Sequence, residues 1–202
     1  MELPTVPGGF RVVCADPATR FICGAKTRPG HYGRMKDHAI AALPVKSVVA
    51  DDALLFLWVT SPKLYRAPGS RMNLTPQEIA EAWGFRFSGR AFVWIKTHRR
   101  FNSGAEPLFF PRDSFHMGTG YTTRKNAEDV LLFRRGRPKR LSRNTHELIV
   151  SPVREHSRKP DIFFQLVEKY ASGPYLELFA RQSRPGWSTW GDEATKFNGG
   201  LA

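Results

Sequence analysis

Apolar residues along this chain gather in short runs between polar stretches, and these runs predict alternating strands and helices. The run Ala53–Val59 is almost uninterrupted, which is typical of a strand that a parallel sheet buries on both faces. Strands are predicted over residues 10–15, 53–59, 85–96, 129–133, 146–150 and 175–179. Short helices are predicted over residues 36–43, from Thr75 to Gly84, and after Pro160. The alternation favours one α/β domain.

Two of the helices carry start signals. Thr75 is suited to an N-cap and Glu78 to the third helical position, which together form a capping box. Pro160 is suited to the first turn of a helix, where its missing N–H costs nothing.

The segment 155–181 contains a basic loop, the helix predicted after Pro160, and then a strand. The loop contains His156, Arg158 and Lys159, and backbone N–H groups at a helix N-terminus favour an anion. The apolar strand that follows, Tyr175–Phe179, leads into the polar end Ala180-Arg181. This order is half of a doubly wound nucleotide-binding unit.

Composition narrows the class of protein. The chain has 202 residues, of which 41% are apolar, with 5 Trp and 15 Phe, so we expect a single packed domain over residues 1–202. No apolar run reaches the length of a membrane span and Met1–Pro4 lacks the features of a signal peptide, so we expect a cytoplasmic protein without a membrane partner. Cys14 and Cys23 favour neither a disulfide framework nor a metal site.

The formal net charge of +13 points to a polyanionic partner, above all nucleic acid. The alternative is a solvated surface that happens to be rich in arginine. The cations cluster in the middle third of the chain, which favours nucleic acid: Arg99, Arg100, Arg112, Arg124, Lys125, Arg134, Arg135, Arg137, Lys139, Arg140 and Arg143.

Several blocks, taken in order, resemble a known family. They are the strand with Asp16-Pro17, Leu55–Trp58, Val93–Lys96, Gly118–Glu128, Glu155–Asp161, Leu176–Arg181 and Gly186-Trp187 with Trp190–Glu193. The series is similar to the adenine-N6 methyltransferases related to the eukaryotic mRNA adenosine methyltransferase, the MT-A-seventy family, in its bacterial or phage DNA-modifying branch. The resemblance implies a Rossmann-like sheet with helices on both faces, S-adenosylmethionine as methyl donor, and a catalytic block that precedes the cofactor block.

The resemblance gives Asp16 and Pro17 the catalytic role. The lone pair of the adenine amine is conjugated with the ring. When a carboxylate and a backbone carbonyl accept hydrogen bonds from the two N–H groups of the amine, the nitrogen lone pair becomes free to attack. The base has to leave its duplex stack, or come from a single strand, to reach such a site.

The chain departs from the family after Pro17, because Ala18 and Thr19 stand where the family has a second proline and an aromatic. That aromatic stacks on the extruded base, a contact worth about 1–3 kcal/mol. Phe21 or Tyr32 are candidates to replace it. Without a replacement, turnover is weakened or the chain is a non-catalytic relative.

For the cofactor, the resemblance implies Asp16, Lys159 near the methionine carboxylate, Phe179 and Arg181 beside the adenosine, and Asp192 with Glu193 at ribose and adenine. Alternatives stay open: core packing for Phe179, and a structural role for Glu177 as partner of Arg181 or Lys159. His156 is expected to orient its neighbours, and Trp187 and Trp190 to pack. An i,i+4 structural pair is preferred for Arg124 and Glu128, with Arg124 also in reach of phosphate.

On the substrate side, two long stretches without periodicity, 20–35 and 97–117, are expected to fold over the target nucleotide and to order on binding. The candidate substrate residues are Thr19, Phe21, Lys26, Arg28, His31, Arg34, Tyr32, Lys96, Arg99, Arg100, Arg112 and Arg124.

The favoured function is therefore an S-adenosylmethionine-dependent methyltransferase of adenine in DNA. A catalytically silent nucleic-acid-binding relative and an RNA methyltransferase are the alternatives. The residues leave a monomer, a dimer and a complex with a partner subunit open.

Overall fold

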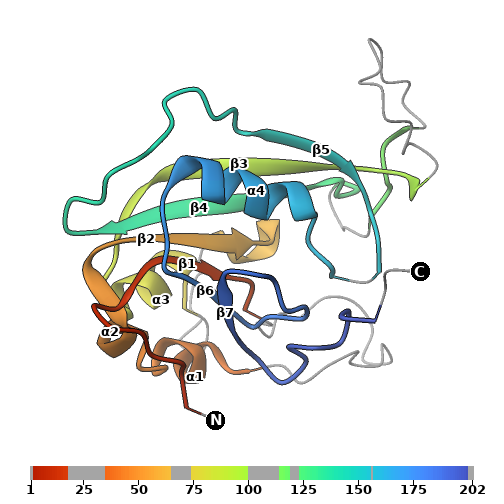
Figure 1. The fold of residues 1–202 in the computed structure, drawn as a ribbon. Helices are drawn as coiled ribbons and strands as arrows, with labels where there is room; N and C mark the ends of the chain where they lie inside the picture. The colour runs from red at the N-terminus through yellow and green to blue at the C-terminus, as the bar shows by residue number, and fades with distance from the viewer. Residues whose placement is uncertain are drawn as a thin grey trace.

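The computed structural model describes residues 2–17, 35–64, 74–99, 114–118, 123–155 and 157–199, and a single sheet runs through them. Its seven strands are ordered β5-β3-β4-β2-β1-β6-β7 (Figure 1). The strands are β1 (Phe10–Ala15), β2 (Val49–Val59), β3 (Arg86–Thr97), β4 (Ala127–Arg135), β5 (Leu148–Pro152), β6 (Tyr175–Leu178) and β7 (Trp187–Trp190). The helices are α1 (Asp37–Ala41), α2 (Val45–Val48), α3 (Pro76–Ala82) and α4 (Asp161–Tyr170), with a 3-10 turn η1 (Ser61–Lys63).

One strand runs against the others. β4 pairs antiparallel with both β2 and β3, whereas the other neighbouring strands in the sheet pair in parallel. The start of β4 therefore lies at the same edge of the sheet as the carboxyl ends of β1, β2, β3 and β6.

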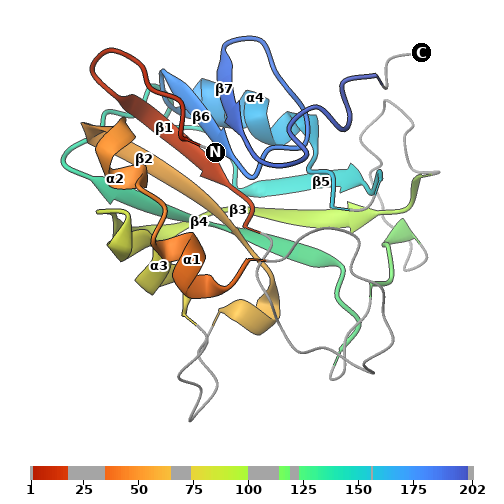
Figure 2. The same cartoon turned by 90° about the horizontal axis from the view of Figure 1, so that it is seen from below.

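The two faces of the sheet bury separate apolar cores, because side chains alternate along each strand. Val13, Leu55 and Phe133 pack with α1 and α3 on one face. Val12, Phe56 and Phe163 pack on the other face, which α4 covers. Figures 1 and 2 show α4 on one side of the sheet and α1, α2 and α3 on the opposite side. The expected α/β architecture, with helices on both faces, is confirmed.

The predicted capping box of α3 is present. The Thr75 hydroxyl accepts a hydrogen bond from the backbone N–H of Glu78, and the Glu78 carboxylate accepts one from the backbone N–H of Thr75. The helix ends at its C-cap Trp83, and Gly84 follows with φ +87°, a left-handed conformation that glycine adopts without strain. The expected end of the helix at Gly84 is confirmed.

Several boundaries differ from the prediction. β2 begins four residues early, because Val49 already pairs with Phe10 although Asp51 and Asp52 are exposed. β5 begins two residues late, at Leu148, where pairing with Val93 starts. The short helix α2 and the strand β7 were not predicted, since their few residues carry too little periodicity.

Segments 18–34, 65–73, 100–113 and 119–122 and His156 lie outside the described residues. The predictions for Thr19, Phe21, Lys26, Arg28, His31, Tyr32, Arg34, Arg100, Arg112 and His156, and most of both substrate segments, lie there too. Within the described ranges, no helix is long and apolar enough to cross a membrane.

Candidate active site

Polar side chains converge where β1, β3 and β6 end, where β4 begins, and where α4 starts. Asp16 directly follows β1, Glu128 is the second residue of β4, and Lys159 precedes the N-cap of α4. Alternation places Lys96 and Glu128 on the face of the sheet that α4 covers, since Trp94 and Val130 belong to that core. Because β4 runs antiparallel to its neighbours, its second residue, Glu128, lies at the sheet edge formed by the carboxyl ends of the other strands.

Asp16, Lys159, Glu128 and Lys96 form a row of ion pairs with alternating charge, which we call the charged chain. Lys159 Nζ lies 3.2 Å from an Asp16 oxygen and 2.6 Å from Glu128 Oε2. The second Glu128 oxygen lies 2.6 Å from Lys96 Nζ. Glu128 therefore joins two lysines, and Lys159 joins two carboxylates.

Burial and neighbouring charges set the proton affinities of this chain. Burial would raise the pKa of Glu128, but Lys159 and Lys96 outweigh it and lower the pKa to about 2. Burial would likewise lower the pKa of Lys159, but Asp16 and Glu128 raise it above its ordinary value. The pKa of Asp16 is raised, chiefly by burial and further by Glu128, although Lys159 opposes the rise. At neutral pH, Glu128 and Lys159 are thus held in their charged forms.

Each of the two lysines makes a cation–π contact with an indole ring. Lys159 Nζ lies 4.6 Å from the centroid of the Trp58 ring, and Lys96 Nζ lies 4.8 Å from that of Trp94. The two rings meet edge to face. Cation–π contacts of this kind hold an ammonium group at a fixed height above an apolar core.

A pocket opens beside this chain. It is lined by Asp16, Ser157, Arg158, Lys159, Glu177, Phe179, Arg181, Gln182, Arg184 and Phe197. Among the described non-glycine residues, Ser157 (φ 62°) and Phe179 (φ 59°) are the ones with positive φ, and both line this pocket. Strained backbone of this kind clusters at functional sites.

Glu177 of β6 places a second carboxylate in the pocket. Among the described residues it forms its ion pair with Arg184, at 2.7 Å, so the alternative of a structural ion pair for Glu177 holds with a different partner from the two considered. Arg184 reaches back from the turn after β6, and it also stacks on Phe164 of α4 at 3.5 Å. Burial raises the pKa of Glu177 to about 7, with Arg184 opposing and the Asp16 charge adding to the rise.

The C-terminal turns close one side of the pocket. Arg181 Nε lies 2.9 Å from a Glu193 oxygen, so the structure brings these two predicted cofactor residues together. The centroid of the Phe197 ring lies 5.1 Å from the Arg158 guanidinium carbon and 5.0 Å from that of Arg181. Asp192, the third predicted residue of this region, is exposed and is not among the residues lining the pocket.

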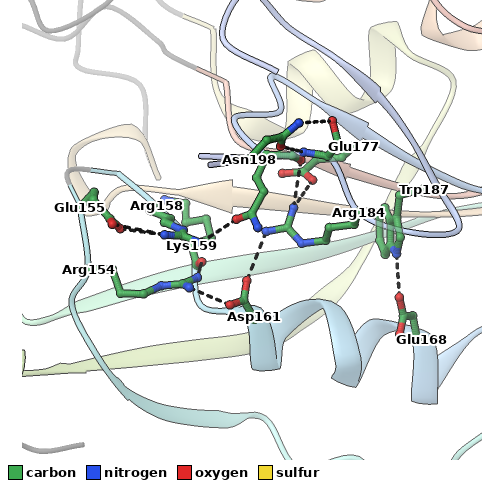
Figure 3. Close-up of polar contacts among 12 residues, drawn as sticks. Arg154, Glu155, Arg158, Lys159, Asp161, Glu168, Glu177, Arg184, Trp187 and Asn198 are labelled. Carbon is green, nitrogen blue, oxygen red and sulfur yellow. Dashed lines mark hydrogen bonds and ion pairs between the residues drawn. The ribbon is translucent and has the colours of Figure 1, made fainter. Parts of the chain in front are cut away.

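Arginines fix the loop that carries Lys159. Arg154 donates to the Lys159 carbonyl and to Asp161, each at 2.6 Å. Arg158 donates to Gln182 at 2.9 Å, which ties the loop to the turn after β6. Figure 3 shows these contacts converging around the first turn of α4.

The chain matches the MT-A70 family model over residues 10–193. The chain belongs to the MT-A70 family. It is 29% identical to the type II methyltransferase M.MunI of Mycoplasma sp over 80% of this chain and 59% of that protein. It is 31% identical to the human N(6)-adenine-specific methyltransferase METTL4 over 93% of this chain and 38% of that protein. It is also 30% identical to the N6-methyladenosine RNA methyltransferase MTA1 of Pyricularia oryzae, over 93% of this chain and 48% of that protein. The chain thus spans between about two fifths and three fifths of the length of these relatives.

With the family known, the predicted residues fall into two groups. Asp16, Lys159, Phe179 and Arg181 line one pocket, with Glu193 paired to Arg181 at its rim. Of the substrate candidates that the structure describes, Lys96 reaches the charged chain. Arg99 donates to the Arg154 carbonyl at 2.8 Å, and Arg124 is exposed just before β4.

The expected pair of Arg124 and Glu128 is wrong. Residues 124–126 are not helical, so a spacing of four does not bring these side chains to one helix face. Glu128 bonds Lys96 and Lys159 instead.

Sequence reasoning missed Glu128, Arg184 and Phe197 as site residues. The one available signal for Glu128 was its place at the end of the block Gly118–Glu128, directly before an apolar strand. The packing of Trp187 is confirmed: it is buried, stacks on Tyr175 at 4.7 Å and donates to Glu168. Trp190 packs edge to face on Phe179 at 5.5 Å.

Proposed function

We propose that this chain uses S-adenosylmethionine to methylate the exocyclic amine of adenine in nucleic acid, and that DNA is the substrate. The observation that carries the proposal is the position of Asp16, which belongs both to the lining of the pocket and to the charged chain. A carboxylate at such a junction is suited to hold a base amine on one side while a methyl donor occupies the other.

The residues of the pocket fit the cofactor. S-adenosylmethionine combines a carboxylate, an ammonium, a positive sulfonium and an aromatic base, and it supplies the methyl group when bound. Lys159, at the start of α4, is suited to its carboxylate, and the aromatic ring of Phe179 to its adenine. The pocket lining combines the carboxylates of Asp16 and Glu177 with four cationic side chains, so it offers partners of both signs to a ligand that carries both.

The chain's own groups prepare the amine. The Asp16 carboxylate and the Pro17 carbonyl each accept a hydrogen bond from one N–H group of the amine, which localises the lone pair on the nitrogen for attack. Lys159 favours the ionised form of Asp16 and holds the carboxylate in place, while Glu128 shares the same ammonium group. After transfer the nitrogen carries the methyl group, both of its original protons and a positive charge, so one of those two protons leaves to Asp16 or to solvent.

DNA is favoured because the sequence blocks resemble the bacterial or phage DNA-modifying branch of the family. RNA is the second candidate, since the relative from Pyricularia oryzae is named an RNA methyltransferase. The surplus of positive charge suits either polymer.

The test is methyl transfer from labelled S-adenosylmethionine to DNA and RNA oligonucleotides of the same sequence. We expect label on adenine in DNA, and a loss of at least about 100-fold in Asp16→Asn, which removes the charge and keeps the shape. Glu81→Gln, an exposed change on α3, is the matched control and should transfer at the wild-type rate.

Three results would contradict parts of the proposal. Label on RNA alone would replace DNA with RNA. Transfer that survives Asp16→Asn would remove Asp16 from the chemistry. Absence of transfer to every oligonucleotide, with cofactor binding intact, would favour the catalytically silent relative.

A further inference from the structure

A second basic surface lies away from the candidate active site. Six of the ten residues from 134 to 143 are arginine or lysine and none is acidic. This segment completes β4 and begins its connection to β5, so it lies at the edge of the sheet opposite the one that holds Asp16. In Figure 1 the connection is the teal segment at the left, whereas the first turn of α4 is at the right.

We propose that this distal basic surface, made of Arg134, Arg137, Lys139, Arg140 and Arg143, binds the phosphate backbone of double-stranded nucleic acid beyond the target base. The choice of nucleic acid as partner rests on the proposed function.

The five side chains are free to bind phosphate. All five residues are exposed, and none has a side-chain hydrogen bond or ion pair with another described residue. Arginines elsewhere in the described chain are often paired, as Arg90 is with Glu147 and Arg154 with Asp161. Unpaired cations on one segment can neutralise the phosphates of a nucleic acid, which releases the counterions condensed on it.

The backbone of the segment is held in place while these side chains are left free. Gly136 has φ +60°, and a Cβ there would lie 2.1 Å from an Asp52 oxygen, so the turn requires glycine. The same Asp52 oxygen accepts a hydrogen bond from the Arg137 N–H at 2.7 Å. Arg135 donates to the Lys46 carbonyl at 3.0 Å.

A second tether fixes the far side of the surface. The Leu141 N–H donates to the Tyr170 carbonyl at 2.7 Å, which attaches the connection to the C-terminal end of α4. Arg86 of β3 lies opposite Arg134 in the register of the sheet, is exposed, and adds a further cation beside the surface. A fixed backbone lowers the entropy lost when the cations engage phosphate.

The spacing sets the length of nucleic acid required. Glu128 at the site and Arg134 at the surface belong to the same strand, about six residues apart, or about 20 Å at 3.4 Å per residue. Double-stranded DNA rises about 3.4 Å per base pair, so about six base pairs separate the two contacts. A short oligonucleotide that fills the active site does not reach the distal surface.

The experiment compares two quadruple variants of the full chain. One replaces Arg134, Arg137, Arg140 and Arg143 with serine, and the other replaces them with lysine, which keeps the charge. Binding of a labelled 30-base-pair DNA duplex is followed by fluorescence anisotropy between about 50 and 200 mM salt. Methyl transfer to a trinucleotide with the target adenine at its centre, which is too short to span this distance, is measured in parallel.

We expect the serine variant to bind the duplex about 10- to 100-fold more weakly, with a log–log salt slope shallower by about 3.5. The lysine variant should stay close to the wild type, and transfer to the short strand should be unchanged in both. Equal duplex affinity and salt slope in the serine variant and the wild type would overturn the proposed surface.

The outcomes separate this inference from the proposed function. A wild type that transfers no methyl group, while the serine variant still loses duplex binding, would refute the activity and support the surface. A wild type that methylates adenine, with duplex binding unaffected by serine, would support the activity and refute the surface. Loss of duplex binding in the lysine variant as well would show that charge is not the cause, which also refutes the surface.

Discussion

Glu128 accepts a hydrogen bond from Lys159 at 2.6 Å although the two residues are 31 positions apart in the chain. The contact joins the start of β4 to the loop before α4, and it fixes the ammonium that reaches Asp16.

Replacing Glu128 by Gln should destabilise the fold by about 2 kcal/mol. The change leaves two poorly exposed lysines without their shared carboxylate, and breaking a buried pair is costly. Denaturant unfolding measures the loss. Glu147→Gln, which breaks an exposed pair with Arg90, is the matched control and should change stability by less than about 0.5 kcal/mol. Equal effects of the two variants would contradict the central place of Glu128.

The same variant should move the acid limb of the pH–rate profile to lower pH. Burial is the main reason why the pKa of Asp16 is raised, and the Glu128 charge adds to the rise, so its removal lets Asp16 ionise at lower pH. The profile of kcat/KM in the wild type and Glu128→Gln measures the shift. A limb that stays in place or moves to higher pH would exclude Asp16 as the titrating group.

Glu177 should make the protein less stable as pH rises from about 4.5 to 7. Burial raises the pKa of Glu177 to about 7 in the fold, so in this window the folded chain binds more protons than the unfolded chain. The contribution levels off above about pH 7, and its slope is at most about 1.4 kcal/mol per pH unit. Urea unfolding at pH 5, 6 and 7 should show this decline in the wild type relative to Glu177→Gln. Parallel curves for the two proteins would refute the raised pKa.

Gly191→Ala should weaken cofactor binding together with stability. A Cβ at Gly191 would lie 2.9 Å from the Ala180 nitrogen, so the turn carrying Glu193 has to move away from Arg181. We expect a loss of about 1–3 kcal/mol in unfolding free energy. We also expect a Kd for S-adenosylmethionine about 10-fold higher, measured by calorimetry. Gly199→Ala, where an added Cβ meets nothing within 4 Å, is the control and should change neither quantity.

Much of the fold could be predicted because its strands carry strong local signals. Ala53–Val59 is buried on both faces, and both sides of that strand pack on helices, as its unbroken apolar run indicates. The capping box at Thr75 and the spacing after Pro160 located two helices within a residue or two. β7 escaped prediction because Trp187–Trp190 gains its strand form from pairing with β6 and from the stack on Tyr175.

The site was only partly predictable, for a different physical reason. Asp16, Lys159 and Arg181 stand at ends of elements, where chemistry is expected in α/β proteins. The partners that tune them come from distant parts of the chain. Nothing near Glu128 in the sequence indicates that Lys159 is its partner, and the bond between Arg184 and Glu177 crosses a turn whose path periodicity does not reveal.

The reversed strand also determines where the chain tolerates insertions. Glu128, Val130 and Leu132 point to the α4 side of β4, and Leu131 and Phe133 point to the opposite side. One residue inserted between 128 and 133 would slip the register of the strand's first half and turn Glu128 away from Lys159. The same insertion after Arg143 would fall in the connection to β5 and leave the strand untouched. Because β4 is paired on both sides, with β2 and with β3, the position of the Glu128 carboxylate depends on the number of residues in the strand.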